Sequence, residues 1–287
     1  MLVSAVTGDV GAGKSTLTAF WREAGASVID ADEIVRMLWT RPEIITAAGF
    51  RWGEGIFDGK GAVLPSRVAA RAFGDEKEYR WLCDLLHPLV RIEMERRTAS
   101  LGGWVVAEIP LLFESGPPWW VDVSVYVTAP DEFRTLRNSV RGWNEDEIPR
   151  RESFLLPSEE KRRRASLVME NSGTLEEFRA LAIKQADLFK RASAIVRGSV
   201  LFQKNEDARR YAEYLHKERL GTEFLCTPAE TFDRNEKGWF FTFFTLEQWF
   251  SLLSQPHCMD SARGPYIERI RRIPWSRSLT LLEELRP

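Results

Sequence analysis

A glycine-rich octet lies near the start of the chain, where residues 8–15 read GDVGAGKS and satisfy the pattern G-x-x-x-x-G-K-[ST]. The octet follows an apolar run at 2–6 that is typical of a strand, and it precedes a helical stretch at 14–24. Chance would place such an octet in a chain of 287 residues on the order of once in a hundred sequences. The pattern therefore predicts a phosphate-binding loop between a strand and a helix.

The residue types of the loop suit this chemistry. Backbone N–H groups must approach phosphate oxygens with no Cβ in the way, and the start of the next helix adds its dipole to the same anion site. Lys14 is expected to reach the β- and γ-phosphates, and the Ser15 hydroxyl is expected to ligate Mg²⁺. An incidental glycine-rich turn is the alternative. The residues expected to bind nucleotide in this loop are Gly8, Gly11, Ala12, Gly13, Lys14, Ser15 and Thr16.

Asp9 is the unusual residue of the loop, because it places a carboxylate close to a site built for anions. One expectation is that its side chain points outward. The other is that it weakens nucleotide binding.

The first two thirds of the chain alternate apolar runs with amphipathic segments. Strands are predicted at 2–6, 27–30, 104–109, 121–127 and 167–169, and helices at 14–24, 33–39, 76–100, 132–141, 157–165 and 174–192. Strands separated by helices of this length predict βαβ units around a parallel sheet that is covered on both faces. The fold class is therefore α/β, with the sheet as the middle of three layers.

Charge and composition exclude several classes of protein. Lys and Arg number 40 against 42 Asp and Glu, so the formal charge of −2 argues against a dedicated nucleic-acid binder. Only three cysteines occur, with no C-x-x-C pair, which suggests free thiols in a reducing compartment. No apolar run approaches the roughly 18 residues of a membrane span, and the chain start lacks the features of a signal peptide. We therefore expect a cytoplasmic protein with no membrane or nucleic-acid partner.

Two acids, Asp30 and Asp32, end the second predicted strand. In open α/β sheets ligands bind outside the carboxyl ends of the strands, so both acids would face the phosphates of the neighbouring loop. Phosphoryl transfer to a hydroxyl needs a carboxylate that accepts the proton, and Asp32 is placed for that role. Asp30 could instead contact Mg²⁺ through water or cap the next helix, and helix capping is the alternative for both acids.

Three arginines, Arg134, Arg137 and Arg141, are spaced at i, i+3 and i+7, which puts them on one face of a helix. Guanidinium groups on a lid would stabilise charge on a transferring phosphate. A surface helix with solvated arginines is the alternative.

Four blocks of sequence together resemble the dephospho-CoA kinase family. They are residues 7–15, VIDAD at 28–32, LHPLV at 86–90 and IPLLFE at 109–114, in the family's order and within about residues 1–195. The resemblance implies ATP- and Mg²⁺-dependent phosphorylation of the ribose 3′-hydroxyl of dephospho-CoA. It also implies a core P-loop domain, a helical acceptor-binding region and a mobile lid.

The resemblance also implies roles for single residues. Asp32, Lys14 and Arg141 are the expected catalytic residues, with Asp32 as the base, while Arg137 and Asn171 join the loop in binding ATP. The expected acceptor-binding residues are Asp32, His87, Leu111, Leu112 and Glu114. Taken without the resemblance, His87 beside Pro88 would more often start a helix, and the run at 111–114 could be core.

The chain departs from the family pattern at two positions, and these leave other functions open. Leu155 stands where a Gln is usual and Ser166 where an Asp is usual, while Asn171 and Gly173 keep the N-x-G that lies by the adenine. Together with Asp9, these changes would affect lid closure and adenine contacts. The alternatives are therefore a nucleotide-binding regulatory protein with weakened catalysis, or another small-molecule or nucleotide kinase.

A basic run at 161–164 follows Glu159 and Glu160. On a helix this arrangement predicts a solvated, ion-paired face rather than a nucleic-acid site.

The last part of the chain, 196–287, is expected to be a separate α+β domain after the kinase domain at 1–195. The predicted elements are a strand at 199–203, a helix at 205–220, strands at 222–227 and 238–245, a helix at 246–254 and a strand near 266–273. This βαββαβ order is the split-βαβ, ferredoxin-like pattern. It resembles the CutA family of trimeric proteins, and this resemblance implies a homo-oligomer such as a trimer.

Overall fold

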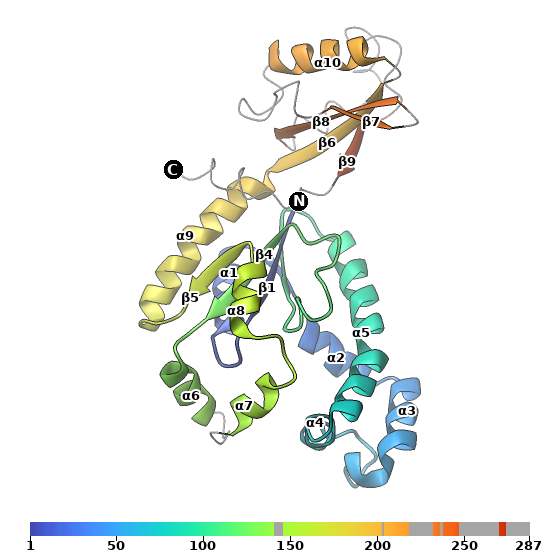
Figure 1. The fold of residues 1–287 in the computed structure, drawn as a ribbon, viewed down its shortest axis with the longest axis vertical. Helices are drawn as coiled ribbons and strands as arrows, with labels where there is room; N and C mark the ends of the chain where they lie inside the picture. Colours follow the sequence, from blue (N-terminus) through green and yellow to red (C-terminus); the bar gives the residue numbers. More distant parts are fainter. Residues whose placement is uncertain (141–145, 203, 218–231, 236–237, 247–269, 274–287) are drawn as a thin grey trace. The chain divides into compact units, whose positions relative to one another are not determined.

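The structure is a computed structural model that describes residues 1–140, 146–202, 204–217, 232–235, 238–246 and 270–273 (Figure 1). The chain divides into two compact units, one of residues 3–186 and one of residues 1–2 with 187–287. The division falls inside a helix, before the boundary expected near residue 195. The assignment of 1–195 and 196–287 as domains stays a prediction.

The first unit contains a five-stranded sheet with the strand order β2-β3-β1-β4-β5, and its strands are parallel (Figure 1). The strands are β1 (Leu2–Gly8), β2 (Ser27–Asp30), β3 (Trp104–Glu108), β4 (Val123–Thr128) and β5 (Leu167–Glu170). All five predicted strands are confirmed, and the α/β class with them.

Helices connect these strands; most of them flank the sheet, and several of those between β2 and β3 pack on one another instead. They are α1 (Lys14–Glu23), α2 (Ala31–Leu38), α3 (Pro42–Trp52), the 3-10 helix η1 (Gly53–Ile56), α4 (Pro65–Ala72), α5 (Glu76–Ala99), α6 (Asp131–Ser139), α7 (Glu147–Glu152), α8 (Ser158–Arg164) and α9 (Leu175–Ser193). The six predicted helices are confirmed, but α3, α4 and α7 were not predicted. Pro42 and Pro65 each stand in the first turn of their helix, where proline is favoured, and this signal could have found α3 and α4.

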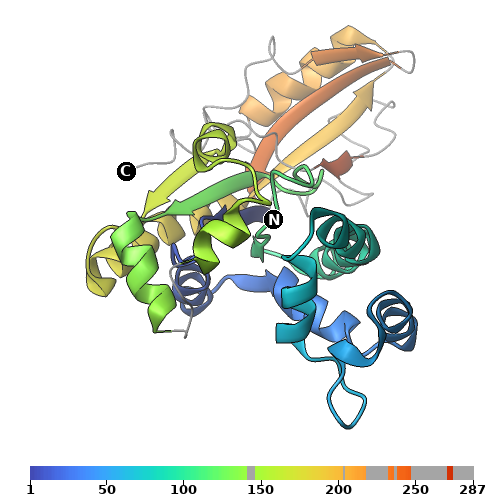
Figure 2. The ribbon, with the colours of Figure 1, turned by 60° about the horizontal axis from the view of Figure 1, so that its bottom comes forward.

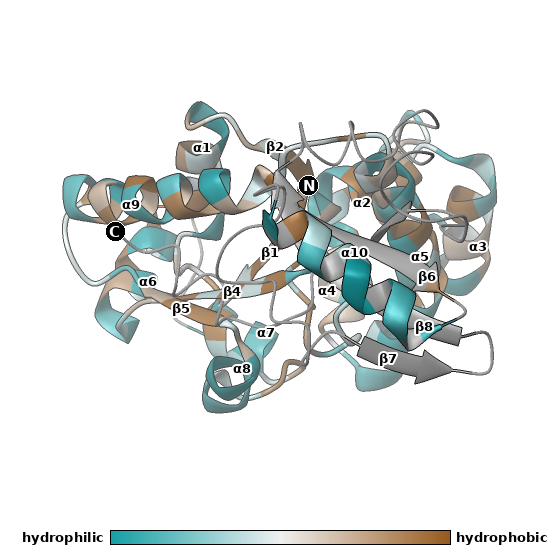
Figure 3. Ribbon diagram, turned by 90° about the horizontal axis from the view of Figure 1, so that it is seen from above, coloured by the Kyte–Doolittle hydropathy of each residue, from teal (hydrophilic) through white to brown (hydrophobic). Residues whose placement is uncertain are grey.

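The core lies around the middle of the sheet. Every residue of β1, β3 and β4 is buried, which explains why these segments have continuous rather than alternating apolar patterns. Trp21 of α1 packs on Trp104 of β3, with ring centroids 5.4 Å apart, and its indole N–H donates to the Ala182 carbonyl at 2.9 Å. Figure 3 shows the contrast in hydropathy between a strand and a helix of this unit: β5 carries mainly hydrophobic residues, whereas α8 carries hydrophilic ones.

The strand order places a ligand site at the end of β1. The order reverses there, because β2 and β3 lie on one side of β1 whereas β4 and β5 lie on the other. Such a switch point is where open parallel sheets bind ligands. Helices α6 and α7 lie on one side of the loop that follows β1, and α2 to α4 lie on the other (Figure 1, Figure 2).

The second unit contains a four-stranded antiparallel sheet with the order β7-β8-β6-β9. Its elements are β6 (Ile195–Phe202), α10 (Asn205–Lys217), β7 (Phe232–Asn235), β8 (Gly238–Leu246) and β9 (Ile270–Ile273). Four of them agree with the predicted strands at 199–203 and 238–245, the helix from 205 and the last strand, whereas β7 was not predicted. The strand predicted at 222–227 and residues 247–254 of the second predicted helix lie outside the described residues; residue 246 ends β8. Across the described segments, no helix is long and apolar enough to cross a membrane.

Candidate active site

The phosphate-binding loop joins β1 to α1, and its backbone requires glycine. Gly11 and Gly13 have φ angles of 78° and 102°, in the left-handed region that disfavours other residues. A Cβ on Gly13 would also lie 2.5 Å from Nδ2 of Asn171. The loop therefore has the shape that the octet predicts, pressed closely against the segment that follows β5.

Lys14 lies at the start of α1 and folds back over the loop. Its Nζ donates to the carbonyl oxygens of Gly8, at 3.1 Å, and Asp9, at 2.9 Å. Burial lowers the pKa of Lys14, while the acids Glu108, Asp32 and Asp9 favour its charged form. The ammonium group is thus placed between the loop and the acids at the ends of β2 and β3.

Glu108, at the end of β3, is a site residue that the sequence reasoning missed. The Ser15 hydroxyl donates to one of its oxygens at 3.3 Å, and the Thr18 hydroxyl donates to the other at 2.9 Å. Burial raises the pKa of Glu108, and Asp30 and Asp32 add to that effect. The sequence offered one signal for Glu108, an acid at the carboxyl end of a predicted strand, and this is the signal that marked Asp30 and Asp32.

Asp9 points into the protein, so the expectation of an outward side chain is wrong. Its residue surface is 3% exposed. The carboxylate accepts hydrogen bonds from Tyr126 at 2.5 Å, Ser158 at 2.6 Å and Thr128 at 2.8 Å. Burial alone would raise the pKa of Asp9, but these hydrogen bonds and the charge of Arg134 hold it below the usual value. Asp9 therefore anchors the loop to β4 and α8.

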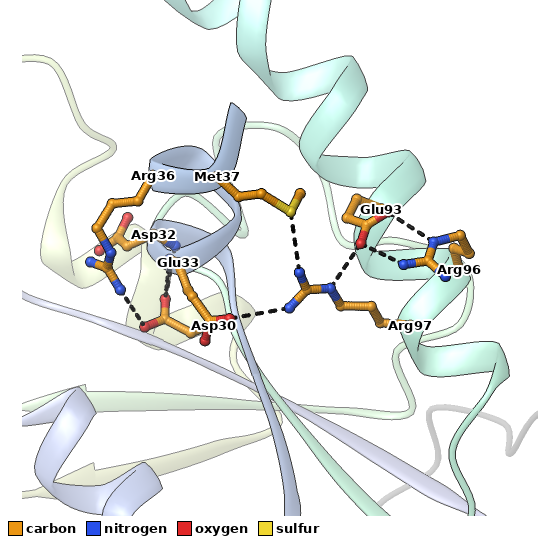
Figure 4. A network of polar contacts seen from close by, with 8 residues as sticks. All are labelled: Asp30, Asp32, Glu33, Arg36, Met37, Glu93, Arg96 and Arg97. Carbon is orange, nitrogen blue, oxygen red and sulfur yellow. Dashed lines mark hydrogen bonds and ion pairs between the residues drawn. The ribbon is translucent and has the colours of Figure 1, made fainter. Parts of the chain in front are cut away.

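Asp30 caps α2, which confirms the capping alternative for this residue. Its Oδ1 accepts the backbone N–H of Asp32 at 2.7 Å and that of Glu33 at 3.4 Å. Arg36, six residues further along α2, has a guanidinium nitrogen 3.9 Å from Oδ2 of Asp30 (Figure 4). Asp30 thereby fixes the start of the helix that carries Asp32.

Asp32 remains exposed, as a residue that meets a substrate must. Its pKa is raised, first because surrounding protein displaces water from the carboxyl group and second because Asp30 lies beside it. Lys14, Arg36 and Arg151 oppose the shift. A carboxylate with a raised pKa is a stronger proton acceptor, which suits a general base.

A polar network holds α2 against α5. Arg97 of α5 donates to Glu33 at 3.4 Å and to Glu93 at 2.9 Å, and it reaches the sulfur of Met37 at 3.6 Å (Figure 4). Arg96 adds a second contact to Glu93, at 2.7 Å. These contacts attach the helix of Asp32 to α5.

Two of the three predicted lid arginines hold the loop itself. Arg134 is buried; its Nε donates to the Val10 carbonyl at 2.9 Å. Arg137 donates to the Ala12 carbonyl at 3.5 Å and to Asn171 at 3.1 Å and 3.2 Å. The solvated-face alternative is therefore wrong for Arg134. Arg141 lies outside the described residues.

Asn171 clamps the loop from the end of β5. It is buried, and its Nδ2 donates to the Ala12 carbonyl at 2.9 Å. Its backbone N–H donates to Thr128 at 2.8 Å. The structure thus places Asn171 against the loop backbone, where it positions the peptide groups that precede Lys14.

The predicted acceptor-binding residues lie on two elements. His87 is half-buried in the middle of α5, so its interpretation as a helix-start residue is wrong. Burial lowers the pKa of His87, and Arg91 adds to that effect. Leu112 is fully buried in the segment after β3, as the core alternative expected, while Leu111 is half-buried.

Glu114 forms a buried ion pair with Lys161 of α8. The Lys161 Nζ lies 2.9 Å from Oε1 of Glu114, which also accepts the Leu156 N–H at 3.1 Å. The Lys161 side chain is only 2% exposed, so the predicted solvated face is wrong for this residue. It is right for Arg163 and Arg164, which are exposed and pair with Glu160.

The two departures from the family pattern occupy different places. Ser166 exchanges hydrogen bonds with Ser124 at the amino-terminal ends of β4 and β5, the opposite end of the sheet from the loop. It therefore does not affect adenine contacts directly, and that expectation is corrected. Leu155 is half-buried in the segment between α7 and α8.

The residue before Leu155 links the two sides of the site. The Phe154 ring contacts Phe73 and Tyr79 of the α4–α5 region, with centroid distances of 5.7 Å and 4.8 Å. The Arg151 guanidinium lies 5.0 Å above the Phe73 ring. The α7 side and the acceptor-side helices are therefore in contact, and they hold Arg151 within electrostatic range of Asp32.

Ser15 and Glu108 together offer a hydroxyl and a carboxylate, which are oxygen ligands that Mg²⁺ prefers. No group of three or more His, Cys, Asp or Glu side chains that could hold a metal ion occurs in the part of the chain that the structure describes. Magnesium in phosphoryl-transfer sites is usually held by one or two protein groups, substrate phosphates and water, so this pair fits such an ion.

Comparison with known proteins agrees with the geometry. The family model for dephospho-CoA kinase matches residues 2–177. A dephospho-CoA kinase from Deinococcus radiodurans is 40% identical over 176 residues, which cover 60% of this chain and 84% of that protein. One from Geobacillus kaustophilus is 38% identical over 189 residues, covering 62% and 92% respectively.

Solved structures show the same fold. TT1252 from Thermus thermophilus is 34% identical, has a TM-score of 0.54, and covers 65% of this chain and 97% of its own. A dephospho-CoA kinase from Campylobacter jejuni is 21% identical with a TM-score of 0.50, covering 66% and 98%.

Proposed function

This chain belongs to the dephospho-CoA kinase family, and on that premise we propose that it transfers the terminal phosphate of ATP to the ribose 3′-hydroxyl of dephospho-CoA, giving coenzyme A and ADP. One observation carries the proposal. The Asp32 carboxylate, which follows β2, lies within electrostatic range of the Lys14 ammonium group, which follows β1. A base and a phosphate-binding cation in one place are what transfer to a hydroxyl requires.

ATP binds at the loop in this proposal. The loop N–H groups and the start of α1 receive the phosphates, and Lys14 turns from the carbonyls of Gly8 and Asp9 toward the β- and γ-phosphates. Ser15 and Glu108 would hold Mg²⁺, which neutralises charge on the phosphates when bound. Arg137 and Asn171 act by fixing the loop peptide at Ala12.

Asp32 accepts the proton of the 3′-hydroxyl as the ribose oxygen attacks the γ-phosphorus. The new bond joins that oxygen to phosphorus, the bond to the β,γ-bridging oxygen breaks, and ADP leaves. The raised pKa of Asp32 favours this proton transfer. Arg141 is proposed to stabilise charge on the transferring group.

The acceptor is proposed to lie on the side of α2 and α5. His87, Leu111, Leu112 and Glu114 remain the candidate residues there. Because Leu112 is fully buried and Glu114 pairs with Lys161, we propose that these two shape the acceptor side, while His87 and Leu111 contact the ligand.

The test is ADP release, measured in a coupled assay with ATP and dephospho-CoA. We expect acceptor-dependent turnover from the pure full-length protein, and its absence would refute the proposal. Asp32→Asn is expected to keep the ATP affinity and to lower turnover by at least about 100-fold, the typical share of a general base.

Glu43→Gln is the control, because it removes one negative charge from an exposed first turn of a neighbouring helix, α3, and has no place in the contacts described above. It is expected to leave turnover within about twofold. If Asp32→Asn lowers ATP affinity and turnover together, or changes neither, the assignment of Asp32 as base is wrong.

Cytoplasmic location and self-association through the second unit stay predictions. The first follows from the cysteine usage of the sequence, and the second from the faint resemblance of residues 196–287 to a trimeric family. Light scattering on the full chain measures the second directly.

A further inference from the structure

Glu152, at the end of α7, brings a carboxylate to the phosphate-binding loop, and the transfer reaction gives it no role. Its side chain forms an ion pair with Arg134, whose own side chain is only 7% exposed. Asp9 and Val10, two residues of the octet, lie close enough to this carboxyl group to shift its pKa, Asp9 upward and Val10 downward. The carboxylate therefore lies beside the loop.

The Arg134 contact of Glu152 is one that a phosphate group beside the loop would also make. Backbone N–H groups of such a loop are its donors for phosphate oxygens. Arginine side chains bind phosphates and carboxylates through the same pairs of N–H groups. Arg134 at the same time donates to the Val10 carbonyl at 2.9 Å and pairs with Asp131 at 2.9 Å, so the ion pair of Glu152 is joined to the loop through Arg134.

We propose that the Glu152 carboxylate stands in for a nucleotide phosphate when no nucleotide is bound, and that ATP must displace it to bind fully. This inference rests on the proposed function of the loop as the ATP site. Glu152 then acts as a built-in competitor that weakens ATP binding. Its displacement also frees α7, which carries Arg151, to move as the nucleotide enters.

The charges around Glu152 allow it to leave without a large penalty. Burial raises its pKa, as does Asp9 in the loop, whereas Arg134 on α6 and Lys161 on α8 lower it. The carboxylate is therefore held by one strong partner but faces a second acid. An incoming phosphate brings more negative charge to Arg134 and can replace it.

Calorimetric titration of the full chain with ATP and Mg²⁺, without acceptor, tests the proposal. Glu152→Gln keeps the size of the side chain but removes its charge, and it is expected to lower the Kd for ATP about tenfold, the effect of losing one charge-assisted contact from a competitor. Glu160→Gln is the matched control. It removes a charge from α8 whose partners, Arg163 and Arg164, point away into solvent, and its Kd should stay within about twofold.

Glu152→Ala provides a second variant, since it removes the carboxylate without placing an amide against Arg134. The same gain in affinity is expected from it, and circular dichroism shows which variants are folded. An unchanged or higher Kd in the folded variants would overturn the proposal while leaving the kinase activity untouched. Failure of every protein, including the unaltered one, to bind ATP would overturn the proposed function and this inference together.

Discussion

Replacing Asp9 by alanine tests whether the acid of the phosphate loop is an internal anchor. In the structure two of its three hydroxyl partners, Tyr126 and Thr128, are buried, whereas Ser158 lies at the exposed start of α8. The variant leaves the two buried hydroxyl groups without their acceptor, while Ser158 can turn to water.

The expected loss of stability follows from those two groups. A buried polar group deprived of its partner costs about 1–3 kcal/mol, so two groups give about 4 kcal/mol of the free energy of unfolding. For a unit of this size that corresponds to a fall in Tm of about 8–16 °C. Asp9→Asn keeps one acceptor oxygen, and we expect about half of the effect.

Thermal unfolding followed by circular dichroism measures the shift, and calorimetry measures ATP affinity on the same samples. The Kd for ATP is expected to rise in both Asp9 variants, because the loop loses its attachment to β4. Asp84→Ala, on an exposed position of α5, is the control and should change the free energy of unfolding by less than about 0.5 kcal/mol. Because the pKa of Asp9 is lowered by folding, its stabilising effect is present above about pH 4 and is lost as the pH falls through the folded-state pKa.

A Tm within about 2 °C of the unaltered protein would refute the reasoning. Tighter ATP binding by Asp9→Ala would do so more directly, since that is the result expected if the carboxylate faced the phosphates. The two arrangements of Asp9 therefore predict changes of opposite sign in one titration.

Two further predictions concern the ion pair of α8 and the pH dependence of catalysis. Lys161→Met removes the ion-pair partner of the half-buried Glu114 carboxylate, and it should reduce the free energy of unfolding by about 3 kcal/mol. The control Arg162→Met, at an exposed position, should change the free energy of unfolding by less than about 0.5 kcal/mol. If urea unfolding gives the same free energy for the two variants, the burial of Lys161 is contradicted. The base must be ionised to accept a proton, and the pKa of Asp32 is raised, so kcat/KM should fall on acidification with an apparent pKa above about 3.9. An apparent pKa below that value in the pH profile would contradict the assignment of Asp32 as the base.

The sequence predicted the parts of the site that are local. Lys14 and Ser15 follow from the octet alone, because a loop between a strand and a helix is specified by a few neighbouring residues. The strands could be predicted equally well, because β1, β3 and β4 are buried on both faces and their sequences are continuous apolar runs. Asp32 followed from its place after such a run.

The errors concern partners that lie far away in the sequence. Asp9 was expected to point outward because an acid beside an anion site is unfavourable, but its partners Tyr126 and Ser158 lie 117 and 149 residues away. Lys161 was expected in solvent for the same reason, since nothing near it reveals Glu114. In both cases tertiary contacts outweighed the local pattern.

Glu108 and the helices α3 and α4 were missed for different reasons. Glu108 ends a strand whose other residues are apolar, and only the pairing of β3 with β1 makes it a neighbour of Ser15. The acceptor-side helices are short, and their apolar residues pack mainly on one another: Ala48, Ile56 and Val68 form a small core of their own.

The hydrogen bond between the Trp21 indole and the Ala182 carbonyl bears on how the chain is synthesised and folds. The family pattern ends at residue 177, yet the acceptor of the Trp21 N–H is the carbonyl of Ala182, a buried residue beyond that end. During translation the Trp21 indole of α1 can therefore form this hydrogen bond only after nearly two thirds of the chain has been synthesised. A fragment that stops where the family pattern stops would expose that core, and a biologist who trims the gene for expression should retain all of α9.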